Sequence, residues 1–330
     1  MATASPPLSL LDLAPIRPGH TARESLEATV ALAQLAEELG YRRVWYAEHH
    51  NFPAIASSTP SVLIAHVAAH TRHIRLGAGG VMLPNHSPLA IAEQFGLLET
   101  LHPGRIDLGL GRAPGTDQNT MHALRSDPAA SERFPSDVLE LQGYLTGNSR
   151  ISGVRAIPGD GTNVPLYILG SSLFGASLAA ALGLPFAFAS HFSPGALRDA
   201  VALYRSDFRP SAQAAEPHVM VGVNVIAADT AEEAERQLTD TKRLRVASML
   251  ARGRTLSDAE ADALIASPAG RQLLQMLTYS AVGTPTEVRE YLADFAEFAG
   301  ADELIVAAQS PTPESRLRSV RLLAEALPQR

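Results

Sequence analysis

Glu48, His49 and His50 stand together just after a strand-like segment at 43–46, and they are the first candidates for chemistry in this sequence. An imidazole titrates near neutral pH, so one of these histidines could act as a general base or donate a hydrogen bond to a cofactor ring. A metal site is an alternative, because histidines also ligate metals. Neighbouring residues on a strand point to opposite faces, however, so the two histidines would not easily hold one ion. Organic catalysis is the favoured interpretation, ahead of a structural role and of metal binding.

Glycines and one arginine mark the ends of two further strand-like segments. These are Leu76-Gly-Ala-Gly-Gly-Val-Met-Leu-Pro84 and Gly104-Arg-Ile-Asp-Leu-Gly-Leu-Gly-Arg112. Glycines at the end of a strand let a flat ligand approach the backbone closely. An arginine just beyond such a strand offers a planar set of donors to a phosphate or carboxylate. The pattern predicts a planar, phosphorylated cofactor, with a surface role for Arg112 as the alternative. The glycine spacing does not match a dinucleotide-binding fingerprint.

Gly170, Ser171 and Ser172 stand between an apolar run and a helical pattern. Free N–H groups at a helix N-terminus bind anions, although a serine there could simply cap the helix. Because Arg112 ends a neighbouring strand, the serines and Arg112 could share one phosphate. His191 and its neighbour Phe192 follow another strand-like segment, and we expect them to form a wall of the binding pocket, with a packed loop as the alternative.

A second histidine group, His66, His70 and His73, contains a spacing of one helical turn that is compatible with zinc binding. The helix that carries His66 and His70 should lie on the outside of a barrel, and it lacks a carboxylate in a metalloprotease-type arrangement. A solvent-facing stripe is therefore the favoured interpretation, and no metal site is predicted.

Composition limits the class of protein. The chain has 330 residues, a formal net charge of -7 and no cysteine. The acidic balance argues against a nucleic-acid partner, and the lack of cysteine excludes disulfides and thiolate metal sites. Basic residues cluster only near Arg42–Arg43, Lys242–Arg245 and Arg316–Arg321, and we interpret each cluster as a solvated face.

Targeting signals are not apparent in the sequence. The first seven residues lack the basic segment and apolar run of a signal peptide. The most apolar stretch, 173–189, is too short for a membrane span and is interrupted by Gly183 and Pro185. We expect a cytoplasmic protein without a membrane partner.

Short apolar runs alternate with amphipathic stretches of helical length, which is typical of βα units around a parallel sheet. Eight strands, most of them followed by a helix, predict a (β/α)8 TIM barrel that occupies residues 1–330 as one domain. The predicted strands are Leu8–Leu13, Arg43–Tyr46, Ile74–Gly80, Ile106–Leu110, Leu166–Leu169, Phe186–Ala189, Val219–Ile226 and Glu303–Val306. The predicted helices include Ala22–Leu39, Pro60–His70, Pro88–Leu101, Glu132–Leu145, Ser172–Leu182, Thr230–Leu250, Thr284–Phe298 and Pro313–Leu327.

Two segments exceed a minimal barrel. Residues 146–163 are expected to contain a small hairpin around Ile151–Ile157, and residues 252–276 form a polar, partly helical insertion that could cover the site. Gly40 and Gly183 stand where a helix would need a left-handed residue at its C-terminal end.

The chain resembles the bacterial-luciferase-like flavin-dependent monooxygenases over most of its length. The resemblance is carried, in order, by Trp45-Tyr-Ala-Glu-His-His50, the segment 76–84, Ala92-Glu-Gln-Phe95, Gly104-Arg-Ile-Asp107 and Val282-Gly-Thr-Pro285. It implies a TIM barrel that binds FMN, delivered as FMNH2 by a separate flavin reductase. It also implies that O2 and reduced FMN oxygenate a small, apolar organic substrate, and that the protein is a homodimer.

The resemblance implies roles for individual residues. His49 matches the catalytic histidine beside the flavin, with Glu48 and His50 as its catalytic neighbours. A non-proline cis peptide bond is implied between Gly79 and Gly80, beneath the flavin ring. The implied cofactor contacts are Ala14, Gly79, Gly80, Met82, Arg112, Gly170, Ser171 and Ser172.

Three positions depart from the family pattern. Gly170 replaces a glutamate, Phe174 replaces a threonine that binds the phosphate, and Gly111 replaces the reactive cysteine of luciferase. These differences argue against light emission and leave the flavin site itself intact. Two alternatives stay open: a deazaflavin (F420)-dependent hydride-transfer enzyme, which would share the barrel, and a non-catalytic flavin-storage protein.

Overall fold

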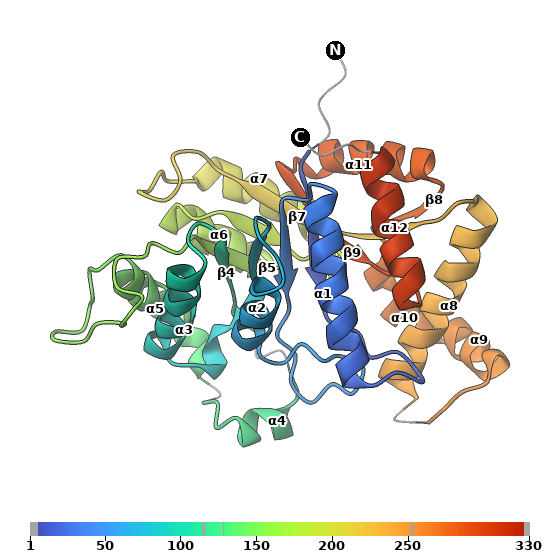
Figure 1. Cartoon of the computed structure of the whole chain (residues 1–330), viewed down its shortest axis with the longest axis horizontal. Coiled ribbons are helices and arrows are strands. Elements are labelled where there is room, and N and C mark those ends of the chain that lie inside the picture. The colour runs from blue at the N-terminus through green and yellow to red at the C-terminus, as the bar shows by residue number, and fades with distance from the viewer. Residues whose placement is uncertain (1–5, 114–115, 128, 252–253, 327–330) are drawn as a thin grey trace, which may run out of the picture.

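Parallel strands closed into a barrel form the centre of the structure, a computed structural model that describes residues 6–113, 116–127, 129–251 and 254–326 (Figure 1). The sheet order is β6-β5-β4-β3-β2-β1-β9-β7-β8, and β6 also pairs with β7. This last pairing closes the barrel, while β8 pairs only with the C-terminal part of β7. The strands are β1 (Leu8–Asp12), β2 (Arg43–Tyr46), β3 (Arg75–Met82), β4 (Ile106–Gly111), β5 (Leu166–Gly170), β6 (Phe186–Phe188), β7 (Val219–Ala227), β8 (Ser280–Gly283) and β9 (Glu303–Ala308).

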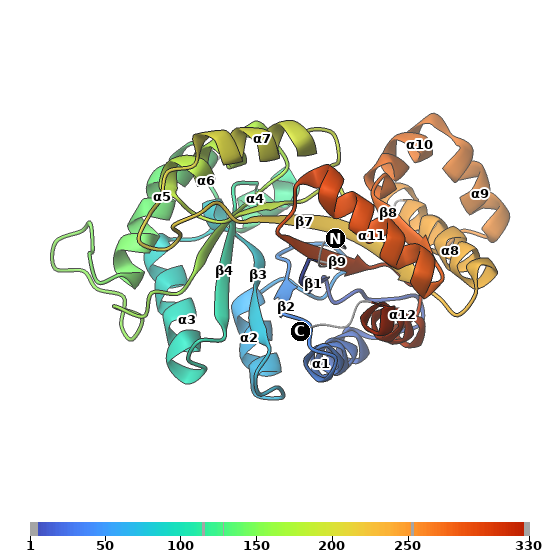
Figure 2. The ribbon, with the colours of Figure 1, turned by 90° about the horizontal axis from the view of Figure 1, so that it is seen from above.

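Helices surround the barrel, as the view in Figure 2 shows. The surrounding helices are α1 (Ala22–Glu38), α2 (Pro60–Ala68), α3 (Pro88–Leu101), α5 (Ala130–Leu145), α6 (Leu173–Leu182), α7 (Leu197–Asp207), α11 (Pro285–Ala299) and α12 (Pro313–Ala326). At one side, α8 (Ala231–Leu250), α9 (Asp258–Ala266) and α10 (Pro268–Leu274) pack against one another. The short helices α4 (Gln118–Ala123), η1 (Leu83–Asn85) and η2 (Gln275–Leu277) lie in loops. Within the described residues, no helix is both long and apolar enough to cross a bilayer.

The eight predicted strands are the eight that close the barrel, so the predicted (β/α)8 fold is confirmed. The left-handed glycines are also confirmed, because φ is 79° at Gly40 and 63° at Gly183. The prediction omitted β8, which has only four residues and lies outside the closed ring. It also omitted α7, although the buried Leu197, Ala200, Val201 and Tyr204 follow the spacing of a helical face.

The predicted hairpin around Ile151–Ile157 is wrong, because residues 151–162 form turns and irregular structure with no strand. Gly153 and Gly161 have φ values of 76° and 79°, which bend the chain away from an extended course. A Cβ atom on Gly96 of α3 would lie 2.1 Å from the Cα atom of Gly159. The segment therefore packs on α3 through two glycines instead of pairing with itself.

The insertion predicted at 252–276 is partly helical, as expected, since α9 and α10 lie within it and η2 begins at its end. Arg252 and Gly253 lie outside the described residues.

Charged side chains fill one end of the barrel interior. Arg43 on β2 is 1% exposed, and its guanidinium lies 2.7 Å from the carboxylate of Asp107 on β4 and 2.9 Å from that of Glu303 on β9. Arg75 on β3 forms a second ion pair with Asp107, at 2.5 Å. A lone charge is costly to bury, so each group here depends on its partners. The ion pairs tie together strands from different parts of the ring.

Trp45 lies next to this charged layer, two residues along β2. Its Nε1 atom donates to Oδ2 of Asp107 at 3.1 Å, and its ring meets that of Tyr167 edge-on at 4.9 Å. A Cβ atom on Gly77 would lie 2.6 Å from Nε1 of Trp45, so the indole occupies space that this glycine leaves. The barrel interior is thus filled by a few large side chains opposite small ones. A larger apolar core lies between the strands and the helices.

The interpretation of the three basic clusters as solvated faces is wrong for Arg43 and Arg316, which are buried, and for Arg245, which is half-buried. Arg43 lies inside the barrel, and Arg316 on α12 is 7% exposed and donates to Oδ1 of Asp12 at 2.9 Å. Their acidic partners Asp107 and Asp12 are 64 and 304 residues away in the sequence. Only the fold brings these charges together.

Arg43→Ala should strongly destabilise the protein, because Asp107 and Glu303 would lose a buried counter-ion. We expect the free energy of unfolding, measured by urea denaturation, to fall by about 3–5 kcal/mol. Arg42→Ala is the matched control, because Arg42 lies 3.7 Å from Glu303 but is 48% exposed. The control should lose about 1 kcal/mol or less. Equal losses in the two variants would contradict the structural role of Arg43.

Candidate active site

The C-terminal ends of the barrel strands carry most of the predicted site residues. Because every strand pairing is parallel, these ends lie on one side of the barrel, the side of α4 in Figure 1. In barrels of this type that side forms the ligand site, since the loops after the strands converge there. The predicted residues found on these strand ends and loops are Glu48, His49, His50, Met82, Arg112, Gly170, Ser171, His191 and Phe192.

Glu48 is the centre of a buried hydrogen-bond cluster. Its Oε1 atom accepts from Nε2 of His50 at 2.9 Å and from Nε2 of His86 at 2.8 Å, and its Oε2 atom accepts from the backbone N–H of Met82 at 3.1 Å. Burial acts to raise the pKa of Glu48, but the hydrogen bonds from His86, His50 and Met82 outweigh it and hold the pKa below its ordinary value. The carboxylate therefore stays ionised at neutral pH and fixes the loop after β2 against the end of β3.

His49 and His191 lie near enough for their charges to interact. The backbone N–H of His49 donates to the carbonyl of Ser57 at 3.0 Å, and its side chain is half-buried. The Nδ1 atom of His191 is buried and has no hydrogen-bond partner among the described residues. Burial, followed by the charges of Arg245 and His49, lowers the pKa of His191 to about 4. The ring of His191 is therefore neutral near pH 7, and its Nδ1 atom packs against Gly222 of β7, where a Cβ atom would lie 2.3 Å from it.

Glycines on β3 and β4 remove side chains from the neighbouring strand ends. The Gly79–Gly80 peptide bond is cis, as the resemblance implied, and it lies where the register between β3 and β4 shifts. A Cβ atom on Gly80 would lie 2.8 Å from the carbonyl oxygen of Gly109, and one on Gly111 would lie 3.0 Å from Sδ of Met82. A larger residue at either position would therefore collide with its neighbour, so the glycines let the ends of β3 and β4 pack closely without a side chain between them.

The N-terminus of α6 has the features of an anion site. Ser172 is its N-cap residue, with extended backbone angles of φ -148° and ψ 170°, but its side chain makes no capping hydrogen bond. The first N–H groups of the helix are thus left without a side-chain acceptor. A Cβ atom on Gly175 would lie 3.3 Å from the Cα atom of Gly170, so the helix begins close against the end of β5.

Arg112 lies beside this helix terminus. Its guanidinium carbon is 3.9 Å from the centre of the Phe174 ring, in the first turn of α6. A guanidinium stacks favourably on an aromatic face and keeps its N–H groups free in the ring plane. Phe174, which replaces the expected threonine, therefore positions the arginine. The donor set of Arg112, Ser171 and the helix N–H groups suits the phosphate of FMN.

Two residues that were predicted to contact a ligand are not well placed to do so. Ala14 follows β1 with a φ of 47°, and its side chain is fully buried at 0% exposure, so it offers no surface to a cofactor as the loop stands. Phe192 is 48% exposed, with its ring 5.3 Å from that of His191.

His66 on α2 and His70 in the turn after it are both exposed, with their rings 4.6 Å apart, as the solvent-facing interpretation predicted. Throughout the described part of the chain, no three His, Asp or Glu side chains are grouped so as to hold a metal.

Several polar residues of this face were not identified from the sequence. His86 lies 38 residues beyond its partner Glu48. On β7, Nδ2 of Asn224 donates to the carbonyl of His191 at 2.9 Å, and Nε2 of Gln309 donates to Oδ1 of Asn224 at 2.8 Å. Arg245 on α8 donates in turn to Oε1 of Gln309 at 2.8 Å. Two amide side chains could have indicated this network in the sequence. Asn224 stands within the otherwise apolar strand β7, and Gln309 directly follows β9.

Comparison with known proteins gives consistent matches. Residues 7–303 match the protein family described as luciferase-like monooxygenase. A luciferase-like monooxygenase of Escherichia coli (strain K12) is 49% identical over 319 residues, which cover 95% of this chain and 95% of that protein. The N-acetyl-S-alkylcysteine monooxygenase of Bacillus subtilis (strain 168) is 41% identical over 247 residues, covering 72% of this chain and 73% of that protein.

A solved structure supports the fold. It is the oxygenating constituent of 3,6-diketocamphane monooxygenase from Pseudomonas putida, a type II Baeyer-Villiger monooxygenase in complex with FMN. The TM-score is 0.74 with 98% of each chain covered, and the sequences are 18% identical. At this level of identity the likeness shows a shared architecture only.

Glu48→Gln should lower stability in a pH-dependent way. The pKa of Glu48 in the folded protein lies below its ordinary value, so its carboxylate contributes stability that is fully present above the unfolded pKa of about 4.3 and is lost as the pH falls through the folded pKa. We expect urea denaturation to show a loss of roughly 1–3 kcal/mol near pH 7, which shrinks in acid. Glu27→Gln, at a residue that is 61% exposed, is the control and should change little. A loss independent of pH would contradict the assignment.

Proposed function

The chain belongs to the luciferase-like monooxygenase family, and from this premise we propose that it uses reduced FMN and O2 to oxygenate a small organic molecule. The observation that carries the proposal is the uncapped N-terminus of α6 with Arg112 stacked beside it, near strand ends that glycines keep free of side chains. The α6 terminus with Arg112 suits a phosphate, and the glycine-rich strand ends suit a flat ring. The FMN seen in the diketocamphane monooxygenase supports the choice of cofactor.

The residues of this chain have separate tasks in the proposal. Arg112, Ser171 and the first N–H groups of α6 would hold the phosphate of FMN. The Gly79–Gly80 segment, with Met82 at the end of β3, would support the flavin ring. When bound, reduced FMN supplies the electrons that activate O2, of which one atom enters the substrate and the other leaves as water.

His49 is the proposed catalytic residue beside the flavin. Its imidazole would donate a hydrogen bond or move a proton at the reacting ring. Glu48 would not touch the reactants, because its two oxygens are already occupied by His50, His86 and the N–H of Met82. We propose that it positions the loop that carries His49. His191 and Phe192 would line the substrate pocket.

The wider proposals follow the family. A separate flavin reductase would supply FMNH2, and the protein would act in the cytoplasm as a homodimer. The Bacillus subtilis relative suggests S-alkylated N-acetylcysteines as the first compounds to screen.

Arg112→Ala should weaken FMN binding and leave riboflavin binding unchanged, because riboflavin lacks the phosphate. Loss of a charged hydrogen-bond donor corresponds to about a tenfold to hundredfold increase in the Kd for FMN. Fluorescence titration with both flavins measures the effect, and Arg289→Ala at an exposed position on α11 is the control. Equal weakening for FMN and riboflavin would place the phosphate elsewhere.

His49→Ala should slow oxygenation by about 10²–10⁴-fold, the usual contribution of a positioned proton donor. The experiment mixes the protein, loaded anaerobically with reduced FMN, with oxygenated buffer, and follows flavin absorbance and product. His70→Ala, at an exposed position in the turn after α2, should behave as wild type.

Three outcomes would contradict the monooxygenase assignment. Reoxidation at the rate of free reduced FMN would mean that the flavin is not held in the site. Tighter binding of F420 than of FMN would favour hydride transfer. A tight complex with oxidised FMN and no turnover would favour flavin storage.

A further inference from the structure

Arg245, in the last turns of α8, is a half-buried cation without an acidic partner. Its terminal nitrogens lie 2.8 Å from Oε1 of Gln309 and 2.9 Å from Sδ of Met276, and neither atom is charged. It forms no ion pair with any residue that the structure describes. Burial lowers the pKa of Arg245, as expected for a cation that lacks a counter-charge.

Arg17, in the loop after β1, is a second such cation. One of its terminal nitrogens donates to the carbonyl of Ser310 at 3.1 Å, and it too has no ion pair within the described residues. Burial, followed by the charges of Arg316 and Arg245, lowers the pKa of Arg17 to about 10. The two cations therefore repel each other in a poorly solvated place.

Asp12 is the acidic group that acts on Arg17, and it is already engaged elsewhere. Its Oδ1 atom accepts from Arg316 at 2.9 Å and from the backbone N–H of Ala14 at 2.7 Å, and its Oδ2 atom accepts from Thr29 at 2.8 Å. Arg316 and Arg17 thus share one carboxylate, and no carboxylate of the described residues is left for Arg245. Burying charges without partners costs free energy, so this arrangement is expected to serve a ligand.

The unpaired cations lie across the barrel mouth from the phosphate site. In the ring of eight strands, the neighbours β9 and β1 stand opposite β4 and β5. Arg112 follows β4, whereas Arg17 follows β1 and binds the segment after β9. Arg245 acts on the pKa of His191 and is linked to the carbonyl of that residue through Gln309 and Asn224. The cations therefore lie at the same end of the barrel as the candidate catalytic histidines, and Arg245 is linked to one of them.

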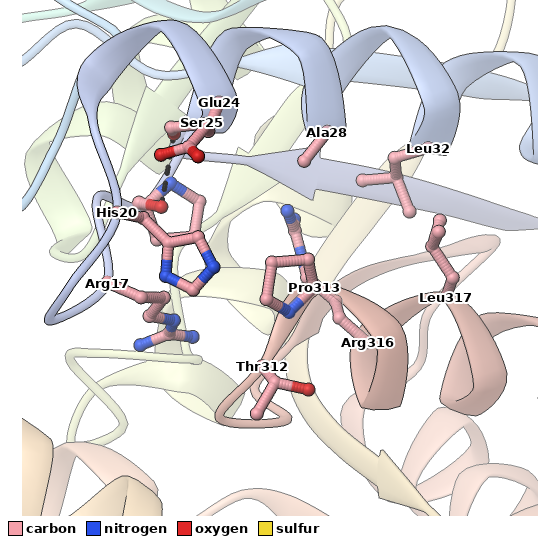
Figure 3. Close-up of a pocket in the computed structure, with 11 residues that line it drawn as sticks. Arg17, His20, Glu24, Ser25, Ala28, Leu32, Thr312, Pro313, Arg316 and Leu317 are labelled. Atoms are coloured by element: carbon pink, nitrogen blue, oxygen red, sulfur yellow. Dashed lines mark hydrogen bonds between the residues drawn. The ribbon is translucent and has the colours of Figure 1, made fainter.

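The pocket between α1 and α12 cannot take the missing anion. Arg17 and His20 line it from the loop after β1, and Arg316 lines it from α12 (Figure 3). Its cavity volume is 20 Å³, which is room for about one water molecule. An organic anion therefore has to approach Arg17 and Arg245 from the barrel mouth.

We infer that Arg245 and Arg17 bind a carboxylate group of the substrate, so that this enzyme oxygenates an organic acid instead of a neutral apolar molecule. FMN has one phosphate, and the α6 terminus with Arg112 provides for it. The cations near β9 and β1 would still lack an anion with the cofactor bound. A guanidinium offers parallel donors to a carboxylate, and the buried setting strengthens the pairing. With the acid group held there, the oxidisable part of the substrate would reach His191 and His49.

This inference rests on the proposed function, because it assumes that the flavin phosphate occupies the α6 side. The test is isothermal titration of the FMN-loaded protein with octanoate, with octanamide as an uncharged match and inorganic phosphate as a bare anion. We expect octanoate to bind about tenfold or more tightly than octanamide. Arg245→Gln and Arg17→Gln should each remove most of this preference. Arg245→Lys should keep part of it, and Arg72→Gln, at an exposed position, should keep it all.

Other results would overturn the inference. One such result is that octanoate and octanamide bind equally well, or that neither binds. Another is that both Arg245→Gln and Arg17→Gln still bind octanoate more tightly than octanamide. Phosphate that binds as tightly as octanoate would indicate a site for a free inorganic ion. FMN affinity, measured in the same samples, shows whether each variant is folded. If the wild-type protein fails to bind FMN, the proposed function falls, and titration of the flavin-free protein still decides whether the carboxylate site exists.

Discussion

The buried ion pairs of Arg43 with Asp107 and Glu303 are the constraint on which the rest of this barrel depends. They join β2, β4 and β9 through the interior, so the closed ring is held from within as well as by backbone hydrogen bonds. Trp45 stacks next to them and fills the space beside the glycines of β3. Because large side chains occupy this part of the interior, the strand ends beyond it can be built from glycine without leaving the barrel empty.

Charged side chains lie at separate places around the end of the barrel where the strands have their C-termini. Glu48 gathers hydrogen bonds from two histidines and a backbone N–H, and so connects the loop after β2 to β3 and η1. Arg112 stacks on Phe174 at the start of α6. Arg17 and Arg245 lie on the opposite side without acidic partners. A cofactor that carries one phosphate and a substrate that carries one carboxylate would together neutralise both cationic sides.

Several features of the site could be predicted from short stretches of sequence, because each feature depends only on residues that are close together in the chain. Glycines at strand ends, an arginine after a strand and serines before a helix are short patterns with a direct physical meaning. Phe174 shows the limit of this reading. Its departure from the family pattern was visible in the sequence, but its stacking against Arg112 was not, because that contact depends on how β4 and α6 lie side by side.

The sequence by itself determined the barrel, since alternation of apolar runs with amphipathic stretches requires no knowledge of distant contacts. It also determined the group at 48–50 and the glycine segments. The tertiary structure decided which charges have partners. Arg43 and Arg316 form ion pairs with buried carboxylates, whereas Arg17 and Arg245 form none within the described residues. The physical reason is that the energy of a buried charge depends on groups within a few ångströms, and the chain brings those groups from positions as far as 304 residues away.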